Sequence, residues 1–203
     1  MVKVTLKEDV VKEFQSGTTV MDIAKSIGMG LYKAACLAKI DGETCDLRTP
    51  VTKDCHVEIL TFDDEDGKKA FWHTTSHILA QAVKRLYPSA KLAIGPSIAN
   101  GFYYDFDVDF SFTPEILEKI EDEMKKIVKE NIPLEQFDLS ADEALKLMEE
   151  KDEPYKVELI KEHAGKGEKI SFYKQAEFTE LCAGPHIPDT GRVKAFKLTS
   201  IAG

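Results

Sequence analysis

Two histidines four residues apart give the sharpest chemical signal in the sequence. His73 and His77 bracket a run of three hydroxyl residues, inside a stretch from Ala70 to Tyr87 that contains no glycine or proline. Such a stretch predicts a helix, and residues i and i+4 share one helical face, so both imidazoles point to the same place. The pair alone is a weak signal, because paired histidines also occur in ordinary cores and on surfaces.

A second motif, Cys182-Ala183-Gly184-Pro185-His186, follows a predicted strand. Its glycine and proline exclude a helix and predict a tight loop. Together the two motifs contain three of the five histidines and one of the four cysteines. Two pairs of imidazole and thiol ligands are also what a tetrahedral zinc site needs, so spacing alone leaves a metal site open. The run lacks the glutamate of H-E-x-x-H, which disfavours a zinc protease.

Three further side chains have types suited to the same chemistry. Lys156 follows Pro154 at a predicted helix start, where a cation is unfavourable to the helix dipole and is normally solvated. Glu180 stands two residues before Cys182, so a strand would place both on one side. Tyr104 lies in the alternating aromatic and acidic run 102–107, which is typical of strand core, although an exposed ring there can stack on a base.

The elements that must position these residues fall into two predicted domains. The acidic run 63–67 separates them and is typical of a solvated linker. Residues 1–62 contain a predicted hairpin (2–6 and 10–14), an amphipathic helix capped at Thr18-Thr19 and ended by Gly28, and strands at 35–40 and 57–62. This ββαββ order predicts a small ubiquitin-like β-grasp domain.

The remainder of the chain predicts a larger α+β domain with an antiparallel sheet and packed helices. Helices are expected at 70–87, 114–130, from the capping box at Ser140 to 150, and at 154–163. Strands are expected at 91–94, 101–107, 170–173, 178–182 and 195–198. The predicted organisation is therefore a domain at 1–62, an acidic linker at 63–69 and a second domain at 70–203.

Composition limits the classes of function. The chain has 203 residues and a formal net charge of −9, which argues against a stand-alone nucleic-acid binder held by charge. It has no apolar run of about 18 residues and no signal-peptide pattern at its start, so we expect no membrane segment. Four sparse cysteines without C-x-x-C spacing favour a reduced, cytoplasmic protein.

Four segments of the sequence resemble a known family. The strings HTTSHILAQAVKRLYP, IGPSIANGFYYDFD, EPYKVELI and FTELCAGPHIPDTG are similar to the N-terminal half of bacterial threonyl-tRNA synthetases. The resemblance covers nearly the whole chain and identifies residues 1–62 as similar to a TGS domain and the remainder as similar to an editing domain. In that family the chain continues into an aminoacylation core and an anticodon-binding domain, both absent here.

The resemblance implies hydrolysis of mischarged seryl-tRNA(Thr) without a cofactor, with the acylated acceptor end of that tRNA as partner. It implies catalytic roles for His73, Lys156 and His186, with His73 on the ribose and the other two handling water and protons. Cys182 is expected to shape the pocket for the serine side chain, His77 to support the helix face, and Tyr104 to stack near the terminal adenine. Glu180, where the family usually has aspartate, is expected to hold the amino group of serine.

Two alternatives remain at this stage. A related, alanyl-type editing domain would use His73, His77, Cys182 and His186 to bind zinc, whereas the threonyl type implies a metal-free hydrolysis. The second alternative is a non-catalytic module that binds RNA or another partner and in which the histidines are structural.

Overall fold

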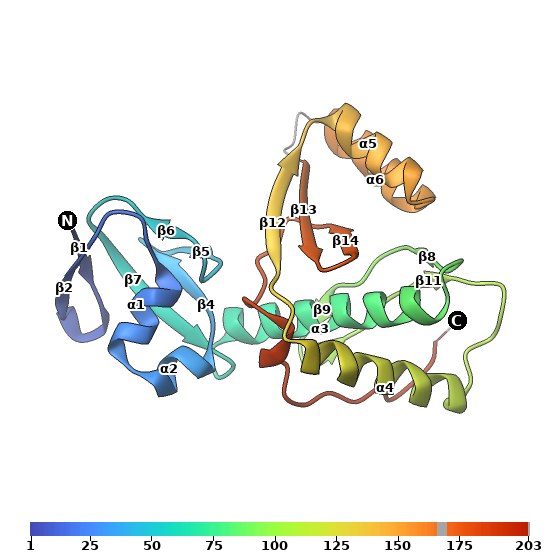
Figure 1. Cartoon of the computed structure of the whole chain (residues 1–203), viewed down its shortest axis with the longest axis horizontal. Helices are drawn as coiled ribbons and strands as arrows, with labels where there is room; N and C mark the ends of the chain where they lie inside the picture. The colour runs from blue at the N-terminus through green and yellow to red at the C-terminus, as the bar shows by residue number, and fades with distance from the viewer. Residues whose placement is uncertain (166–169, 203) are drawn as a thin grey trace. The chain divides into compact units, whose positions relative to one another are not determined.

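The computed structural model describes residues 1–165 and 170–202 (Figure 1). The chain divides into two compact units, one comprising Met1–Thr74 with Pro185–Pro188 and the other Thr75–Gly184 with Asp189–Gly203. Among the described residues, no helix has the length and apolar character needed to cross a membrane.

The first unit is built on a five-stranded sheet of order β2-β1-β7-β4-β5. Its elements are β1 (Val2–Thr5), η1 (Lys7–Asp9), β2 (Val11–Phe14), β3 (Thr18–Thr19), α1 (Val20–Ile27), α2 (Met29–Ala34), β4 (Ala35–Ile40), β5 (Glu43–Cys45), β6 (Pro50–Val51) and β7 (Cys55–Thr61). The strands β1 and β7 pair in parallel, while the other pairs in this sheet are antiparallel. The predicted hairpin, helix and β-grasp fold are confirmed.

Helix α1 covers the sheet with the apolar stripe that its sequence predicts. Val20 and Ile23 are fully buried and pack with Val4 of β1 and Val57 of β7 in one core cluster. The helix starts where expected, because the side chain of Thr19 accepts a hydrogen bond from the backbone N–H of Asp22 at 3.2 Å. It ends at Gly28, as predicted.

Helix α3 (Glu65–Leu86) begins five residues before the predicted start at Ala70. The carboxylate of Asp64 accepts hydrogen bonds from the backbone N–H and the hydroxyl of Thr61, at 2.7 and 3.1 Å. Gly67 allows this tight junction, because a Cβ there would lie 2.0 Å from the carbonyl oxygen of Thr61. Residues 65–69 of the expected acidic linker are therefore helical, while the domain boundaries themselves stay a prediction.

The second unit combines helices with short antiparallel sheets. Besides the rest of α3, its elements are β8 (Lys91–Leu92), β9 (Ser97–Ile98), β10 (Gly101–Phe102), β11 (Phe106–Asp107), α4 (Pro114–Glu130), β12 (Glu135–Leu139), α5 (Ala141–Glu150), α6 (Pro154–Gly165), β13 (Ile170–Gln175), β14 (Phe178–Leu181) and η2 (Thr190–Arg192). Strands β12, β13 and β14 form an antiparallel sheet, and α5 and α6 share a core cluster with it around Phe172. The expected caps at Thr113 and Ser140 are present, and the α+β class is confirmed.

Three strand assignments in this unit were wrong. The single strand expected at 101–107 is two short strands, β10 and β11, which pair in different sheets. The segment 195–198 is not a strand, because the backbone N–H of Leu198 donates to the carboxylate of Glu121 at 3.1 Å instead of to a neighbouring strand. Conversely, β12 was not predicted. Only Phe137 and Leu139 carry its apolar alternation, and that is too short a pattern to distinguish a strand from a loop.

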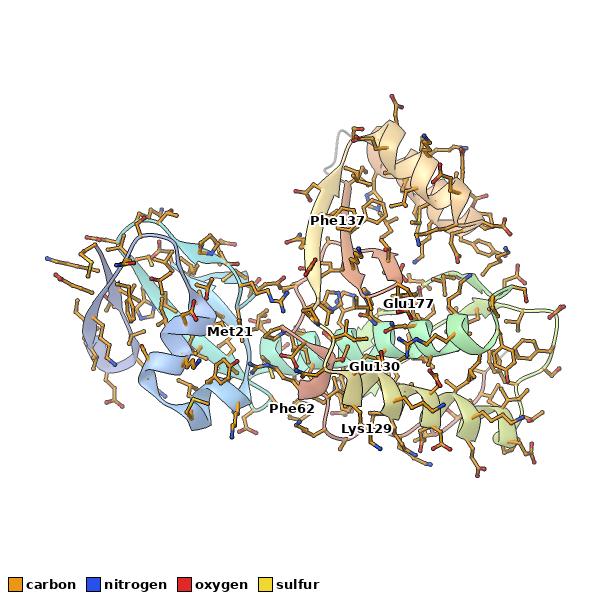
Figure 2. All side chains as sticks on the ribbon, in the orientation of Figure 1. Met21, Phe62, Lys129, Glu130, Phe137 and Glu177 are labelled. Carbon is orange, nitrogen blue, oxygen red and sulfur yellow. The ribbon has the colours of Figure 1, made fainter. Side chains whose placement is uncertain are left out.

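A single arginine ties α3 to α4 and to the turn between β13 and β14. The guanidinium of Arg85 donates to Glu130 at 2.7 and 2.9 Å and to Glu177 at 2.6 Å; both glutamates are labelled in Figure 2. The hydrogen bonds from Arg85 lower the pKa of Glu177 to about 2. This network fixes the hairpin that carries Glu180 against the helix that carries His77.

We predict that Glu177→Gln flattens the dependence of stability on acid pH. The folded pKa of Glu177 lies below its ordinary value, so its contribution is present above about pH 4.5 and is lost as the pH falls toward 2. Because Glu177 is half exposed, we expect a loss at neutral pH of about 0.5–1 kcal/mol. Urea unfolding at pH 7 and pH 3 measures it, with Glu118→Gln, on the exposed face of α4, as the matched control. Equal pH slopes for wild type and Glu177→Gln would contradict the assignment.

Candidate active site

Helix α3 carries both predicted histidines, and the hydroxyl residues between them bind the neighbouring loops. Thr74, fully buried, has its hydroxyl 2.9 Å from Nδ1 of His186 and accepts a hydrogen bond from the backbone N–H of Ile187 at 3.2 Å. Ser76 donates its hydroxyl to the carbonyl of Gly95 at 2.7 Å. The buried hydroxyls of this helix therefore fix the loops that meet it.

The loop after β14 has the tight conformation that its glycine and proline predict. Gly184 has a φ of 75°, in the left-handed region, and a Cβ there would lie 2.2 Å from the hydroxyl of Tyr173. Only glycine fits both constraints. The backbone N–H of Gly184 donates to Sγ of Cys182 at 3.2 Å, which orients the thiol at the start of the loop.

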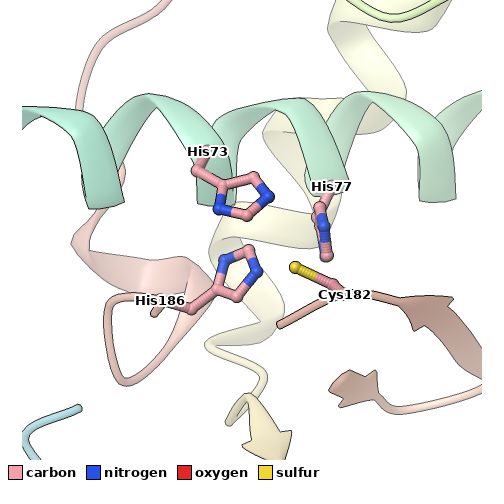
Figure 3. A group of neighbouring side chains, drawn as sticks. All are labelled: His73, His77, Cys182 and His186. Carbon is pink, nitrogen blue, oxygen red and sulfur yellow. The ribbon is translucent and has the colours of Figure 1, made fainter. Parts of the chain in front are cut away.

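The two sequence motifs meet in one cluster. The ligand-type atoms of His73, His77, Cys182 and His186 all lie within 4.8 Å of one another (Figure 3). The rings of His73 and His186 are 4.2 Å apart between centroids, with 31° between their planes. Three imidazoles and a thiol form a donor set that can hold a metal ion such as zinc.

Burial sets the charge of His73. It lowers the pKa of this imidazole to about 4, and a hydrogen bond to the backbone of Pro185 opposes the shift only in part. His73 is therefore neutral at pH 7, and one ring nitrogen can accept a proton or a hydrogen bond.

Lys156, Glu180 and Tyr104 form a second, buried polar cluster. Nζ of Lys156 lies 2.5 Å from Oε1 of Glu180, and the hydroxyl of Tyr104 donates to Oε2 at 2.6 Å. The side chains of Lys156 and Glu180 are 6% and 2% exposed. The expectation that Lys156 is solvated was therefore wrong, because its ammonium group is buried in an ion pair with the carboxylate of Glu180.

Tyr104 has contacts that differ from the expected stacking on a base. Its side chain is buried and its ring stacks on Phe106 with 4.7 Å between centroids. Gly95 leaves the space for it, because a Cβ there would lie 2.0 Å from the tyrosine ring. Burial first, and then Glu180, raise the pKa of Tyr104 well above 10, so its hydroxyl remains a donor. The neighbouring ring of Tyr103 is the exposed one.

The remaining predicted residue, His77, is buried within α3. Its ring lies edge-on to Phe178, 6.4 Å between centroids, and its carbonyl accepts a hydrogen bond from the side chain of Gln175 at 3.4 Å. Sequence reasoning missed Thr74 and Ser76. Their signal was available, since three successive hydroxyl residues inside a helix are unfavourable unless their side chains find partners.

Comparison with known proteins defines the class of these domains. Residues 2–61 match the TGS domain family. Residues 170–203, which include Glu180, Cys182 and His186, match the threonyl and alanyl tRNA synthetase second additional domain. The chain therefore combines a TGS domain with a domain of the kind found in these two synthetases.

A closer relationship follows from full-length similarity. The whole chain is 64% identical to a threonine–tRNA ligase of Clostridium botulinum, 61% identical to one of Clostridium tetani and 60% identical to one of Acetivibrio thermocellus. It spans 32% of the length of each of these relatives. The chain is thus similar throughout to the N-terminal region of bacterial threonine–tRNA ligases.

We predict that Lys156→Met destabilises the fold strongly while Lys161→Met does not. Methionine keeps the apolar stem of Lys156 but leaves the buried carboxylate of Glu180 without its cation, at an expected cost of about 3 kcal/mol or more. Lys161 is exposed on the same helix and provides the matched control. Chemical denaturation measures both, and similar free energies of unfolding for the two variants would contradict a stabilising buried pair.

Proposed function

We propose that this chain hydrolyses the ester between serine and tRNA(Thr), as the proofreading part of a threonine–tRNA ligase. The observation that carries the proposal is the convergence of His73, His77, Cys182 and His186 in a chain that is similar throughout to such ligases. The match to a domain of threonyl and alanyl synthetases supports it.

A physical need for this reaction exists in any threonine-specific synthetase. Serine is smaller than threonine by one methyl group, which is worth only about 1–3 kcal/mol of discrimination in a binding pocket. A second site that admits serine, excludes threonine by size and hydrolyses the ester supplies the missing selectivity.

The hydrolysis needs only water as a co-reactant. Water attacks the carbonyl carbon of the seryl ester, the bond from that carbon to the ribose oxygen breaks, and the ribose oxygen receives a proton. Neutral His73 is suited to contact the neighbouring ribose hydroxyl, while His186 and Lys156 assist the water and the proton transfer. The cation of Lys156 also stabilises negative charge that develops on the carbonyl oxygen.

The buried cluster supplies recognition of the serine moiety. Glu180 is the acceptor for the amino group of serine. Its two oxygens already contact Lys156 and Tyr104, so the amino group either binds beside Lys156 or replaces it. Tyr104 holds this carboxylate in place through its hydroxyl. Cys182 shapes the wall beside the serine side chain, and His77 supports the helix face behind it.

The proposed partner is the acylated acceptor end of tRNA(Thr), in the cytoplasm. A net charge of −9 leaves little general attraction to phosphates. Recognition by this chain is therefore local to the terminal nucleotide and its amino acid.

Zinc fits the donor set, but we propose that hydrolysis proceeds without it. His73, His77, Cys182 and His186 would hold the ion, which would act as a Lewis acid toward the carbonyl or lower the pKa of water. A site that uses four protein ligands is closed, whereas catalytic zinc sites keep one position open for water. The buried cation of Lys156 offers positive charge by another route.

We predict that the purified chain hydrolyses seryl-tRNA(Thr) at least tenfold faster than threonyl-tRNA(Thr). His73→Ala should lower the serine rate by about 100-fold, as expected for loss of a positioned acid–base or contact group. His56→Ala, which alters an exposed histidine of β7, should leave the rate unchanged. Release of labelled amino acid from the tRNA measures all of these rates.

Three results would contradict the proposal in different ways. Equal rates of seryl-tRNA(Thr) hydrolysis for wild type and His73→Ala would remove His73 from the proposed catalytic residues. Faster hydrolysis of seryl-tRNA(Ala) than of seryl-tRNA(Thr) would indicate an alanyl-type editor. Absence of hydrolysis with all three substrates would exclude a deacylase.

We predict less than 0.1 zinc per chain by elemental analysis of protein that is purified without chelator and then dialysed. Chelation should leave the rate of seryl-tRNA(Thr) hydrolysis unchanged, because no step depends on the ion. About one tightly held zinc per chain, with activity lost on chelation and restored by zinc, would overturn the metal-free reaction.

A further inference from the structure

Two side chains of the TGS domain hold the loop that carries His186. Oδ1 of Asp46 accepts a hydrogen bond from the backbone N–H of His186 at 2.9 Å. The guanidinium of Arg48 donates to the carbonyl of Pro188 at 2.9 Å. Both bonds lie within the first compact unit, to which Pro185–Pro188 belongs together with residues 1–74.

The segment that presents Asp46 and Arg48 is itself firmly anchored. Leu47, between them, is fully buried in the core of the β-grasp sheet. Its carbonyl accepts a hydrogen bond from the backbone N–H of Met21 at 2.7 Å, and the carbonyl of Thr49 accepts one from Val20 at 3.1 Å. This fixes the segment to the start of α1, so Asp46 and Arg48 project from a rigid base.

The loop that they hold has a second anchor on α3. Thr74 contacts both Nδ1 of His186 and the backbone N–H of Ile187, and the His186 side chain is 1% exposed. The backbone of the loop is thus bound on the TGS side, while the imidazole is bound on the helix side and lies 4.2 Å from the ring of His73, between centroids. Loss of the backbone anchor would let the ring shift relative to His73.

We infer that Asp46 and Arg48 are positioning residues for His186, so that the TGS domain forms part of the support of the editing site. This inference rests on the proposed function. Neither side chain needs to contact the substrate; both act through the backbone on either side of the imidazole. A misplacement of about 1 Å at a reacting group can cost about 100-fold in rate, so these anchors affect hydrolysis and not only folding.

The test compares Asp46→Ala with Asp46→Asn in the full chain. Alanine removes the acceptor for the N–H of His186, and we expect hydrolysis of seryl-tRNA(Thr) to fall about 10- to 100-fold. The loss should appear in kcat and leave KM nearly unchanged. Asparagine keeps an oxygen at the same position and should restore most of the rate. Arg48→Met should behave like Asp46→Ala, and Arg48→Lys should be intermediate.

Asp54→Ala is the matched control for stability. The carboxylate of Asp54 accepts a backbone hydrogen bond of the same kind, from the N–H of Lys3 at 2.8 Å, elsewhere in the TGS domain. We expect Asp54→Ala to lower the thermal midpoint as much as Asp46→Ala does but to hydrolyse at the wild-type rate. An equal loss of rate in the two variants, or no rescue by asparagine, would overturn the inference.

Amide hydrogen exchange separates this inference from the proposed function. In Asp46→Ala the amide of His186 should exchange at least tenfold faster than in wild type, and in Asp54→Ala it should not. If wild type fails to hydrolyse seryl-tRNA(Thr), the proposed function fails even where exchange shows the anchor. If wild type hydrolyses it and Asp46→Ala keeps the full rate, only the positioning role is overturned.

Discussion

The carboxylate of Glu180 imposes the strictest requirement on the second unit. An ionised carboxylate with an exposed fraction of 2% is stable only with nearby donors or cations, because removal from water costs several kcal/mol. Lys156 must therefore leave solvent, and Tyr104 must keep its proton and face the same point. Glycine is required at position 95 for the same reason, because a Cβ there would displace the ring of Tyr104. One buried charge thus explains a buried lysine, a donor phenol and a glycine.

The loop that carries His186 is held in place by contacts from residues outside it. The loop from Cys182 to Pro188 has little regular structure of its own, and its conformation depends on groups that bind it from outside. Tyr173 fills the space beside Gly184, Thr74 binds at His186 and Ile187, and Asp46 binds the amide of His186. The position of an imidazole on such a loop depends on these contacts, so the geometry of the histidine cluster is set partly by residues outside it.

Much of the architecture could be predicted because local signals determine it. Period-two alternation gave the first hairpin, and the hydroxyl caps at Thr19, Thr113 and Ser140 marked three helix starts. Residue type and spacing left a shared metal site open for the H-x-x-x-H and C-x-x-x-H motifs, and the family resemblance implied one pocket for their four residues, whose ligand-type atoms lie within 4.8 Å of one another in the structure. The burial of Lys156 could not be predicted, because it depends on Glu180, a partner distant in sequence. The early start of α3 was missed for a similar reason, since Asp64 reads as one more acid in a polar run until its bond to Thr61 is seen.

The continuity of β7, Asp64 and α3 matters for anyone who dissects this chain. Truncation at Ala70, where composition alone places the second domain, would remove the first turn of α3 and the junction between Thr61 and Asp64 that precedes it. His73 would then be the fourth residue of a new terminus, where backbone N–H groups lack helical partners and the chain frays. Such a deletion would disorder the very histidine whose chemistry the excised domain was meant to report. An autonomous version would need to begin upstream of Thr61 or carry a new capping residue.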